Sequence, residues 1–385
     1  MEKLKIENFN GIKYAEFEVK PFNLIIGPQS SGKSLCMKLL YFFREVMDRT
    51  FNHFHYSYYE DFKVGSEILF KNFFNPISET NIKYSNGDFK TFIKVRNGSI
   101  TQFDATKDIL TRSFEFGEKI RSKSISLQSI EYFKQTVIDE YNIDICPTQY
   151  VISNRNYFSL IDRNPYNHTE AVQNFDFIMN RYGSKLRENI SFFTPLNIRS
   201  KVVNAMNKVL NGMLIEKNEH LFIKHNDGRT VKISSTSSGQ QSAYPLFVFI
   251  NRFLLQDFKM TSSLFVEEPE AHLYPTAQKE IMNLLVYMLN QRNGQNELFI
   301  TTHSPYILSY LNVLMEAYRV KSPKIIEEDF WLNPDCLNPM AFNEEGVLVN
   351  IFDQETGLIN AEAFDKSAEE IDTLFSQLLE SDIND

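Results

Sequence analysis

Apolar and polar residues alternate along the first twenty positions of the chain. This pattern over residues 3–19 predicts two strands joined by a turn at Asn10-Gly11. The apolar run at 22–26 ends at a glycine, which indicates a buried strand. From Lys33 onward, apolar residues recur at helical spacing without a breaker. The sequence therefore predicts a strand, a glycine-containing loop and a helix near the start of the chain.

The middle of the chain combines hairpins with helical segments. Residues 81–106 alternate and contain two Asn-Gly turn signals, so antiparallel hairpins are expected. Residues 108–142 and 169–217 have helical texture, and 149–153 is a compact strand candidate between them.

Strands and helices also alternate in the second half. Four further strand segments are predicted, at 220–233 (a hairpin turning at Asp227-Gly228), 264–268, 297–301 and 340–352. Helices are predicted after the Ser/Gly-rich run 234–242, at 276–290, and at the polar, acidic C-terminus. There is no internal repeat and no sustained heptad pattern, so an α/β core is expected.

Length, composition and charge indicate a globular protein with a large core and exclude one that is basic overall. The chain has 385 residues, of which 43% are hydrophobic and 23% charged, so it can bury a large core. Its net charge of −9 excludes a protein that is basic overall, but allows a local basic groove. The three cysteines are far apart in the sequence, which argues against a disulfide framework. The N-terminus lacks a signal-peptide core and no apolar run is long enough for a membrane span, so a soluble, cytoplasmic protein without a membrane partner is expected.

The strongest chemical signal is GPQSSGKS at 27–34, which matches G-x-x-x-x-G-K-[ST] between a predicted strand and a predicted helix. In such a loop the glycines let backbone amides approach phosphate oxygens, the lysine reaches the β- and γ-phosphates, and the final hydroxyl binds Mg²⁺. The predicted nucleotide-binding residues are Gly27, Pro28, Gln29, Ser30, Ser31, Gly32, Lys33 and Ser34, with Ser34 also a metal ligand.

A second signal is LFVEEPE at 264–270, an apolar strand that ends in adjacent carboxylates. Next to a phosphate loop, Glu267 is expected to belong to the Mg²⁺ shell, and Glu268 to orient and deprotonate the attacking water. Without that loop, two glutamates at a strand end would more often be a solvated edge.

Two weaker signals complete the set. The run TSSGQQS at 236–242 precedes a helix and could bind an anion, although taken alone a plain serine cap is the more common explanation. His303 lies just beyond a predicted strand, where a polar contact to the γ-phosphate belongs, although a lone histidine is more often structural.

In this order, the four motifs resemble the ABC ATPase superfamily. The strings LKIENFNGIK and EEPEAHLYP resemble its SMC- and RecF-related branch, and especially OLD-family ATPase domains and ATPase subunits of bacterial antiphage systems. The resemblance implies an α/β P-loop NTPase fold, ATP and Mg²⁺ as cofactors, and a homodimer or higher homo-oligomer. It implies that Ser237, Gly239 and Gln240 form a signature motif that contacts ATP held by another subunit. It also implies that Glu268 is the general base, that Glu270 to Leu273 belong to the D-loop, and that Lys33 and His303 (the switch histidine) take part in catalysis.

The sequence departs from the family pattern at several positions. Gln29-Ser30 stands where Asn-Gly is common, and the signature reads Thr-Ser-Ser-Gly-Gln. Glu267 replaces the more frequent aspartate, so Mg²⁺ could sit differently and turnover is expected to be slow. The Q-loop is not identified, and Asn154 and Arg155 are candidates only.

These observations predict an ATPase core interrupted by an insertion. The expected segments are 1–50 (core with the phosphate loop), 51–215 (inserted hairpins and helical lobe), 216–318 (core with signature, acidic strand and His303) and 319–385 (C-terminal extension).

The preferred function is a dimerisation-gated ATPase switch that controls a separate effector, a nuclease or toxin, in antiphage defence. The main alternative is a compact SMC/RecF-like DNA-binding ATPase, and the sequence leaves open whether nucleic acid is a ligand. Long coiled-coil arms are excluded because the stretch between Ser34 and Ser237 contains hairpins and no heptads. A transporter subunit fits the EEPEAHLYP string poorly, and a scaffold that binds ATP without hydrolysis is disfavoured by Lys33 and Glu268.

Overall fold

The structure is a computed structural model of the 385-residue chain. It describes residues 1–74, 79–122, 126–144, 146–160, 177–193, 198–217, 220–255, 262–291 and 296–360.

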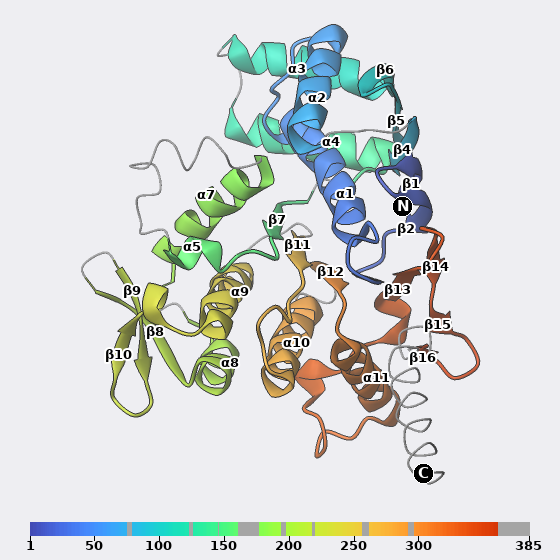
Figure 1. The fold of residues 1–385 in the computed structure, drawn as a ribbon. Helices are drawn as coiled ribbons and strands as arrows, with labels where there is room; N and C mark the ends of the chain where they lie inside the picture. The colour runs from blue at the N-terminus through green and yellow to red at the C-terminus, as the bar shows by residue number, and fades with distance from the viewer. Residues whose placement is uncertain are drawn as a thin grey trace, which may run out of the picture.

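A six-stranded, mostly parallel sheet forms the centre of the fold (Figure 1). Its strands, in spatial order, are β14 (Leu348–Asn350), β13 (Leu337–Phe342), β3 (Phe22–Ile26), β12 (Asn296–Thr302), β11 (Ser262–Glu267) and β7 (Thr148–Val151). Only β14 runs antiparallel to its neighbour. Every residue of β3 and β11 is buried, as expected of central parallel strands with near-continuous apolar sequence. The parallel strands therefore bring their carboxyl ends to one edge.

A five-stranded antiparallel sheet contains the N-terminus. Its spatial order is β2 (Ile12–Glu18), β1 (Glu2–Phe9), β4 (Thr80–Asn86), β5 (Phe89–Arg96) and β6 (Ser99–Ala105). One face buries residues such as Leu4, Ile82 and Ile93, and the alternate residues face outward, as the period-two pattern requires. The hairpins predicted for 3–19 and 81–106 are confirmed.

Helices pack around the two sheets. They are α1 (Lys33–Met47), α2 (Tyr59–Phe73), α3 (Lys107–Arg121), α4 (Leu127–Tyr141), α5 (Tyr157–Leu160), α7 (Phe177–Ser191), α8 (Ser200–Leu210), α9 (Ser238–Leu255), α10 (Pro275–Asn290) and α11 (Pro305–Val320). Short turns of other helix types are Asp48–Asn52, Ile233–Ser235, Glu328–Phe330 and Pro334–Cys336, and β15 (Phe352–Asp353) pairs with β16 (Leu358–Ile359). In Figure 1, α2 to α4 lie near the antiparallel sheet, and α10 and α11 lie side by side at the other end of the molecule.

The helix predicted to extend through residue 217 ends earlier, so that part of the prediction is wrong. Asn211 adopts a left-handed φ of 52° and closes α8, as Asn often does after a helix. Gly212 then starts β8 (Gly212–Lys217), where a Cβ atom would lie 2.4 Å from the Lys224 carbonyl oxygen. That close approach allows β8 to pair with β9 (His220–His225), which also pairs with β10 (Thr230–Lys232).

Other differences are smaller. The helical region 108–142 consists of two helices, α3 and α4, and the sequence patterns did not single out α2 or α11. The part of 169–217 before Phe177 and the predicted C-terminal helix lie outside the described residues.

The four-segment division of the chain stays a prediction. The central sheet takes strands from all four segments, since β3, β7, β12 and β13 fall in different ones. In the part of the chain that the structure describes, no helix is both long and apolar enough to cross a membrane.

Candidate nucleotide site

Strand register places three of the predicted motifs at one edge of the central sheet. Ile26 of β3 pairs with Thr302 of β12, and Thr301 pairs with Glu267 of β11. The residues that follow these strands are Gly27, His303 and Glu268. The phosphate loop, the histidine and the catalytic carboxylate predicted from sequence therefore lie together.

The phosphate loop has the backbone that the motif requires. Gly32 has a φ of 102°, a left-handed value that favours glycine, and a Cβ there would lie 2.6 Å from the Ile12 side chain. A Cβ on Gly27 would lie 2.9 Å from Ser31 Oγ. A side chain at Gly32 would therefore clash with Ile12, whereas a side chain at Gly27 would require the Ser31 hydroxyl to move.

The side chain of Lys33 folds back onto the backbone of this loop. Its ammonium donates hydrogen bonds to the carbonyl oxygens of Gly27 at 2.7 Å and Pro28 at 2.6 Å. Burial lowers the pKa of Lys33, and the carboxylates of Glu268 and Glu270 oppose that shift. A phosphate group in the loop would give this buried cation an anionic partner.

The remaining loop residues differ in exposure. Pro28, Gln29 and Ser30 are exposed, whereas Ser31 and Ser34 are partly buried. Ser31 Oγ is buried without a hydrogen-bond partner. Buried hydroxyls normally have partners, so this orphaned group fits a loop that completes its hydrogen bonds on a ligand.

Glu267 is buried at the end of β11, where both carboxylate oxygens accept hydrogen bonds. The Tyr150 hydroxyl donates to Oε1 at 2.7 Å, and the Ser153 backbone N–H donates to Oε2 at 3.1 Å. Tyr150 was not singled out from the sequence as a site residue, because an aromatic residue in a predicted strand usually packs in a core.

A metal ion here would need ligands from the nucleotide. In the described ranges, no group of three or more His, Cys, Asp or Glu residues is arranged to hold a metal. Ser34, phosphate oxygens, water and the fixed carboxylate of Glu267 are together a donor set that Mg²⁺ accepts, since Mg²⁺ keeps several waters. The residues present fit the metal only as part of a nucleotide complex.

Glu268 combines a strained backbone with an accessible side chain. Its φ is 45°, unusual for a residue with a long side chain, and its N–H donates to the Thr301 carbonyl at 2.8 Å. The carboxylate is 29% exposed, and its Oε1 lies 3.8 Å from His303 Nδ1. Glu268 can therefore meet both solvent and a ligand in the loop.

Glu270 holds the segment around His303. Its Oε1 accepts the Thr302 hydroxyl at 2.7 Å and the His303 backbone N–H at 2.9 Å. Its other oxygen is buried without a partner. The family resemblance implied that Glu270 belongs to the D-loop, but gave no reason to expect this contact.

The predicted signature lies at the start of α9. The Gln240 side chain accepts the Ser237 N–H at 3.3 Å and donates to the Leu210 carbonyl at 2.7 Å. A Cβ on Gly239 would lie 2.8 Å from the His272 carbonyl oxygen, so the start of α9 packs directly on the segment predicted to be the D-loop. Ser237 is exposed, and none of the described residues of the phosphate loop forms a hydrogen bond with the signature residues.

The two Q-loop candidates occupy different environments. Asn154 is exposed, whereas Arg155 is fully buried. The guanidinium of Arg155 donates only to backbone carbonyls, among them those of Glu267 at 2.9 Å and Glu268 at 3.0 Å.

Residues 1–308 match the AAA ATPase domain family. The chain belongs to this family. No curated protein sequence shows significant similarity to it.

Several solved structures align with most of this chain at low sequence identity. The SMC head domain from Thermotoga maritima aligns with a TM-score of 0.37 at 13% identity and covers 91% of this chain and 97% of its own. The Pyrococcus furiosus Smc head with an extended coiled coil, bound to the C-terminal domain of ScpA, has a TM-score of 0.39 at 15% identity and covers 96% and 100%. The cbiO1 protein of Clostridium perfringens, part of an ABC transporter complex, has a TM-score of 0.30 at 15% identity and covers 90% and 86%.

The fold class predicted from sequence is confirmed. The chain is an α/β P-loop NTPase domain, with antiparallel sheets and helices added to its central, mostly parallel sheet.

Proposed function

We propose that this protein binds and hydrolyses ATP as a dimerisation-gated switch. The proposal rests on two groups of predicted site residues, one at the edge of the central sheet and one at the start of α9, that share no hydrogen bond among the described residues. Lys33, Glu268 and His303 meet at one sheet edge, while Ser237 is exposed and has no hydrogen bond to the phosphate loop within the described residues. In a head-to-tail pair, each signature would complete the site of the other copy.

The residues of the site divide the work of hydrolysis. Lys33 exchanges the carbonyls of Gly27 and Pro28 for phosphate oxygens. Ser34 and Glu267 would hold Mg²⁺, and a bound Mg²⁺ would supply positive charge beside the phosphates. Glu268 accepts a proton from the attacking water, and His303 contacts the γ-phosphate from beside it. Because ATP would bind the closed pair more tightly than the separated chains, its binding closes the dimer and hydrolysis reopens it.

The process that this switch controls is proposed from the resemblance to OLD-family and antiphage ATPases. In that setting the ATPase responds to an invader and holds or releases a separate effector of nuclease or toxin chemistry. Glu267 in place of aspartate favours slow turnover, which suits a switch.

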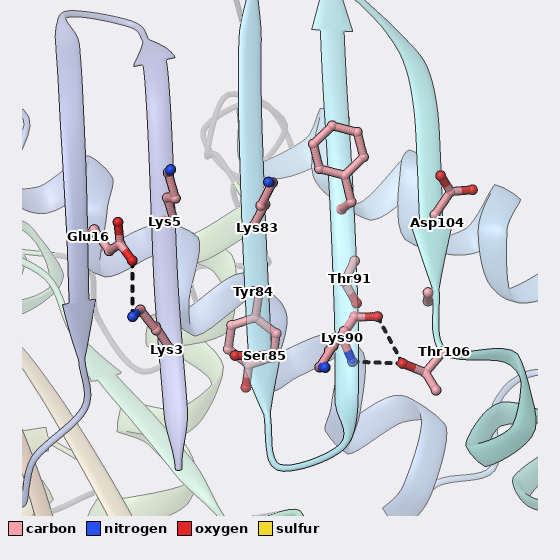
Figure 2. A pocket seen from close by; sticks show the side chains of 12 residues that line it. Lys3, Lys5, Glu16, Lys83, Tyr84, Ser85, Lys90, Thr91, Asp104 and Thr106 are labelled. Carbon is pink, nitrogen blue, oxygen red and sulfur yellow. Dashed lines mark hydrogen bonds and ion pairs between the residues drawn. The ribbon is translucent and has the colours of Figure 1, made fainter.

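A second candidate function, nucleic-acid binding, is favoured by one surface. A hollow of about 520 Å³ lies on the outer face of the antiparallel sheet, and Figure 2 shows the side chains that line it. Lys5 and Lys83 are directly opposite each other on β1 and β4, and Glu7, 3.0 Å from the Lys5 ammonium, already offsets part of their repulsion. Glu16 and Asp104 also line this hollow and reduce its positive charge. The two remaining lysines are Lys3 and Lys90.

Hydrolysis is tested by Glu268→Gln, with Glu328→Gln on an exposed turn as the matched control. We expect Glu268→Gln to lower the ATP turnover number by at least about a hundredfold while the ATP dissociation constant changes little. The Glu328→Gln variant should behave as wild type. Unchanged turnover in Glu268→Gln would overturn the assignment.

Nucleic-acid binding is tested by fluorescence anisotropy with a labelled DNA duplex at several salt concentrations. Lys83→Ala with Lys90→Ala should weaken binding and reduce its salt dependence, whereas Lys321→Ala with Lys324→Ala should not. If the wild-type protein does not bind the duplex at low salt, nucleic-acid binding is excluded as a function of this surface.

A further inference from the structure

One buried arginine joins the two halves of the nucleotide machinery. Arg155 has no exposed surface, and its guanidinium has five N–H donors. All five are used on backbone carbonyl oxygens. These belong to Ser242 (2.7 Å), Ile152 (3.4 Å), Glu267 (2.9 Å), Glu268 (3.0 Å) and Pro269 (3.2 Å).

Three of these carbonyls hold the catalytic segment. Glu268 has a φ of 45°, and a long-chain residue keeps such a conformation only when its surroundings impose it. Arg155 fixes the carbonyl side of Glu268, and the Thr301 carbonyl fixes its N–H at 2.8 Å. The orientation of the Glu268 carboxylate therefore depends on Arg155.

The fourth carbonyl belongs to the signature helix. Ser242 lies four residues after the start of α9, and it accepts from Arg155 Nε at 2.7 Å, the shortest of the five bonds. The same helix start touches the D-loop, because the backbone at Gly239 packs against the His272 carbonyl. A movement of α9 is thus transmitted to the backbone of Glu268 through one rigid, planar group.

We infer that Arg155 is a positioning residue that couples the signature helix to the catalytic Glu268 of the same chain. The inference rests on the proposed function, in which that signature serves the ATP held by the partner. When the signature helix of one chain closes on the ATP held by its partner, Arg155 then sets the orientation of the Glu268 carboxylate at that chain's own ATP. The two sites of a dimer therefore hydrolyse ATP cooperatively. A lysine cannot replace this arginine, because a single ammonium cannot reach carbonyls on three segments.

Arg44 offers a matched control. It is also buried, but its hydrogen-bond partners are the side chains of Glu2, Cys146, Glu297 (at 2.6 Å) and Ser263, at the end of β11 away from Glu267. Arg44→Lys should therefore disturb packing without touching the coupling, whereas Arg155→Lys should disturb both.

The experiment compares full-length wild type, Arg155→Lys and Arg44→Lys by ATP titration, turnover number and Hill coefficient, each corrected for the fraction that binds nucleotide. For Arg155→Lys we expect an ATP dissociation constant within about threefold of wild type, a turnover number lower by about thirtyfold or more, and a Hill coefficient reduced to one. For Arg44→Lys we expect a lower unfolding midpoint with unchanged turnover per binding site and an unchanged Hill coefficient. Equal turnover and cooperativity per binding site in both variants would overturn the inference, whereas an inactive wild type would overturn the proposed function instead.

Amide hydrogen exchange on the wild-type protein tests the same coupling without a substitution. With a non-hydrolysable ATP analogue and Mg²⁺, residues 267–272 and 238–244 should gain protection at the same analogue concentration. Protection of one segment without the other would contradict the coupling.

Discussion

Glu270 accepts the backbone N–H of His303 at 2.9 Å, and its Oε1 lies 3.7 Å from the His303 ring nitrogen Nδ1. Glu270 is buried, whereas the His303 side chain is 54% exposed. The segment that follows β11 therefore fixes the backbone of the histidine while its ring stays free to reach a ligand. This contact joins the ends of two neighbouring strands that the sequence separates by more than thirty residues.

Removal of this ring should affect chemistry more than binding. His303→Ala is expected to lower the ATP turnover number by about ten- to a hundredfold, because a contact to the γ-phosphate matters most as charge develops there. The ATP dissociation constant should change by less than about fivefold. Steady-state kinetics and calorimetric titration measure the two quantities. The exposed His55 supplies the control His55→Ala, and a similar loss in both variants would contradict a role at the phosphate.

Substitution of Lys33 should affect ATP binding, in contrast to substitution of His303. Its ammonium now rests on the carbonyls of Gly27 and Pro28, and phosphate oxygens would take their place. Lys33→Ala should weaken ATP binding by about a hundredfold, because a buried charge-assisted contact is lost. Lys38→Ala, on the same helix, is the control and should bind ATP normally. A normal isotherm for Lys33→Ala would show that the loop does not bind phosphate.

The exposed signature allows dimerisation to be separated from folding. Ser237→Arg adds a bulky cation to an exposed residue and removes the hydroxyl that accepts the Gln240 N–H at 3.3 Å, so the variant should lose about 1 kcal/mol of stability but still fold and bind ATP. Its turnover should nevertheless fall by at least about thirtyfold, because the partner's site is no longer completed. Thr101→Arg, on the exposed side of β6, should leave turnover unchanged. Full turnover in Ser237→Arg would place the signature outside the active site.

The hydroxyl of Tyr150 supports Glu267 and should influence the metal. Tyr150→Phe removes the donor 2.7 Å from Glu267 Oε1 and keeps the ring. We expect about 1 kcal/mol less stability in urea unfolding, the usual contribution of such a bond. The Mg²⁺ concentration that gives half-maximal turnover should shift by a few fold, whereas Tyr58→Phe, on an exposed tyrosine, should shift neither quantity. If Tyr150→Phe loses stability but keeps its Mg²⁺ dependence, the hydroxyl has a structural role only.

Much of the fold followed from local patterns. The strand at 22–26 and the helix from Lys33 have the predicted limits because apolar periodicity and the glycine loop agree there. The hairpins of the antiparallel sheet followed from alternation and Asn-Gly turns. The sequence analysis missed strand β8. The strand pairs with β9 through a close backbone approach at Gly212, and the spacing of apolar residues around it gives no sign of that approach.

The site divides in the same way. The phosphate loop and the acidic strand are local motifs, so their residues were expected from the sequence, whereas the strand register that places them at one sheet edge is seen in the structure. The contacts of Arg155 and Glu270 join segments far apart in the chain and end on backbone groups, which carry no signal in the residue types around them. The contact of Tyr150 with Glu267 likewise depends on the pairing of β7 with β11, which the sequence did not predict.

The mass of the Glu268→Gln variant in solution, measured by light scattering after size exclusion with and without MgATP, tests the central claim most directly. Without hydrolysis the closed state should accumulate, so MgATP should double the measured mass, and adding Ser237→Arg to the same chain should prevent the doubling. A mass that does not respond to MgATP, or a doubling that survives Ser237→Arg, would contradict an ATP-gated dimer closed through the signature.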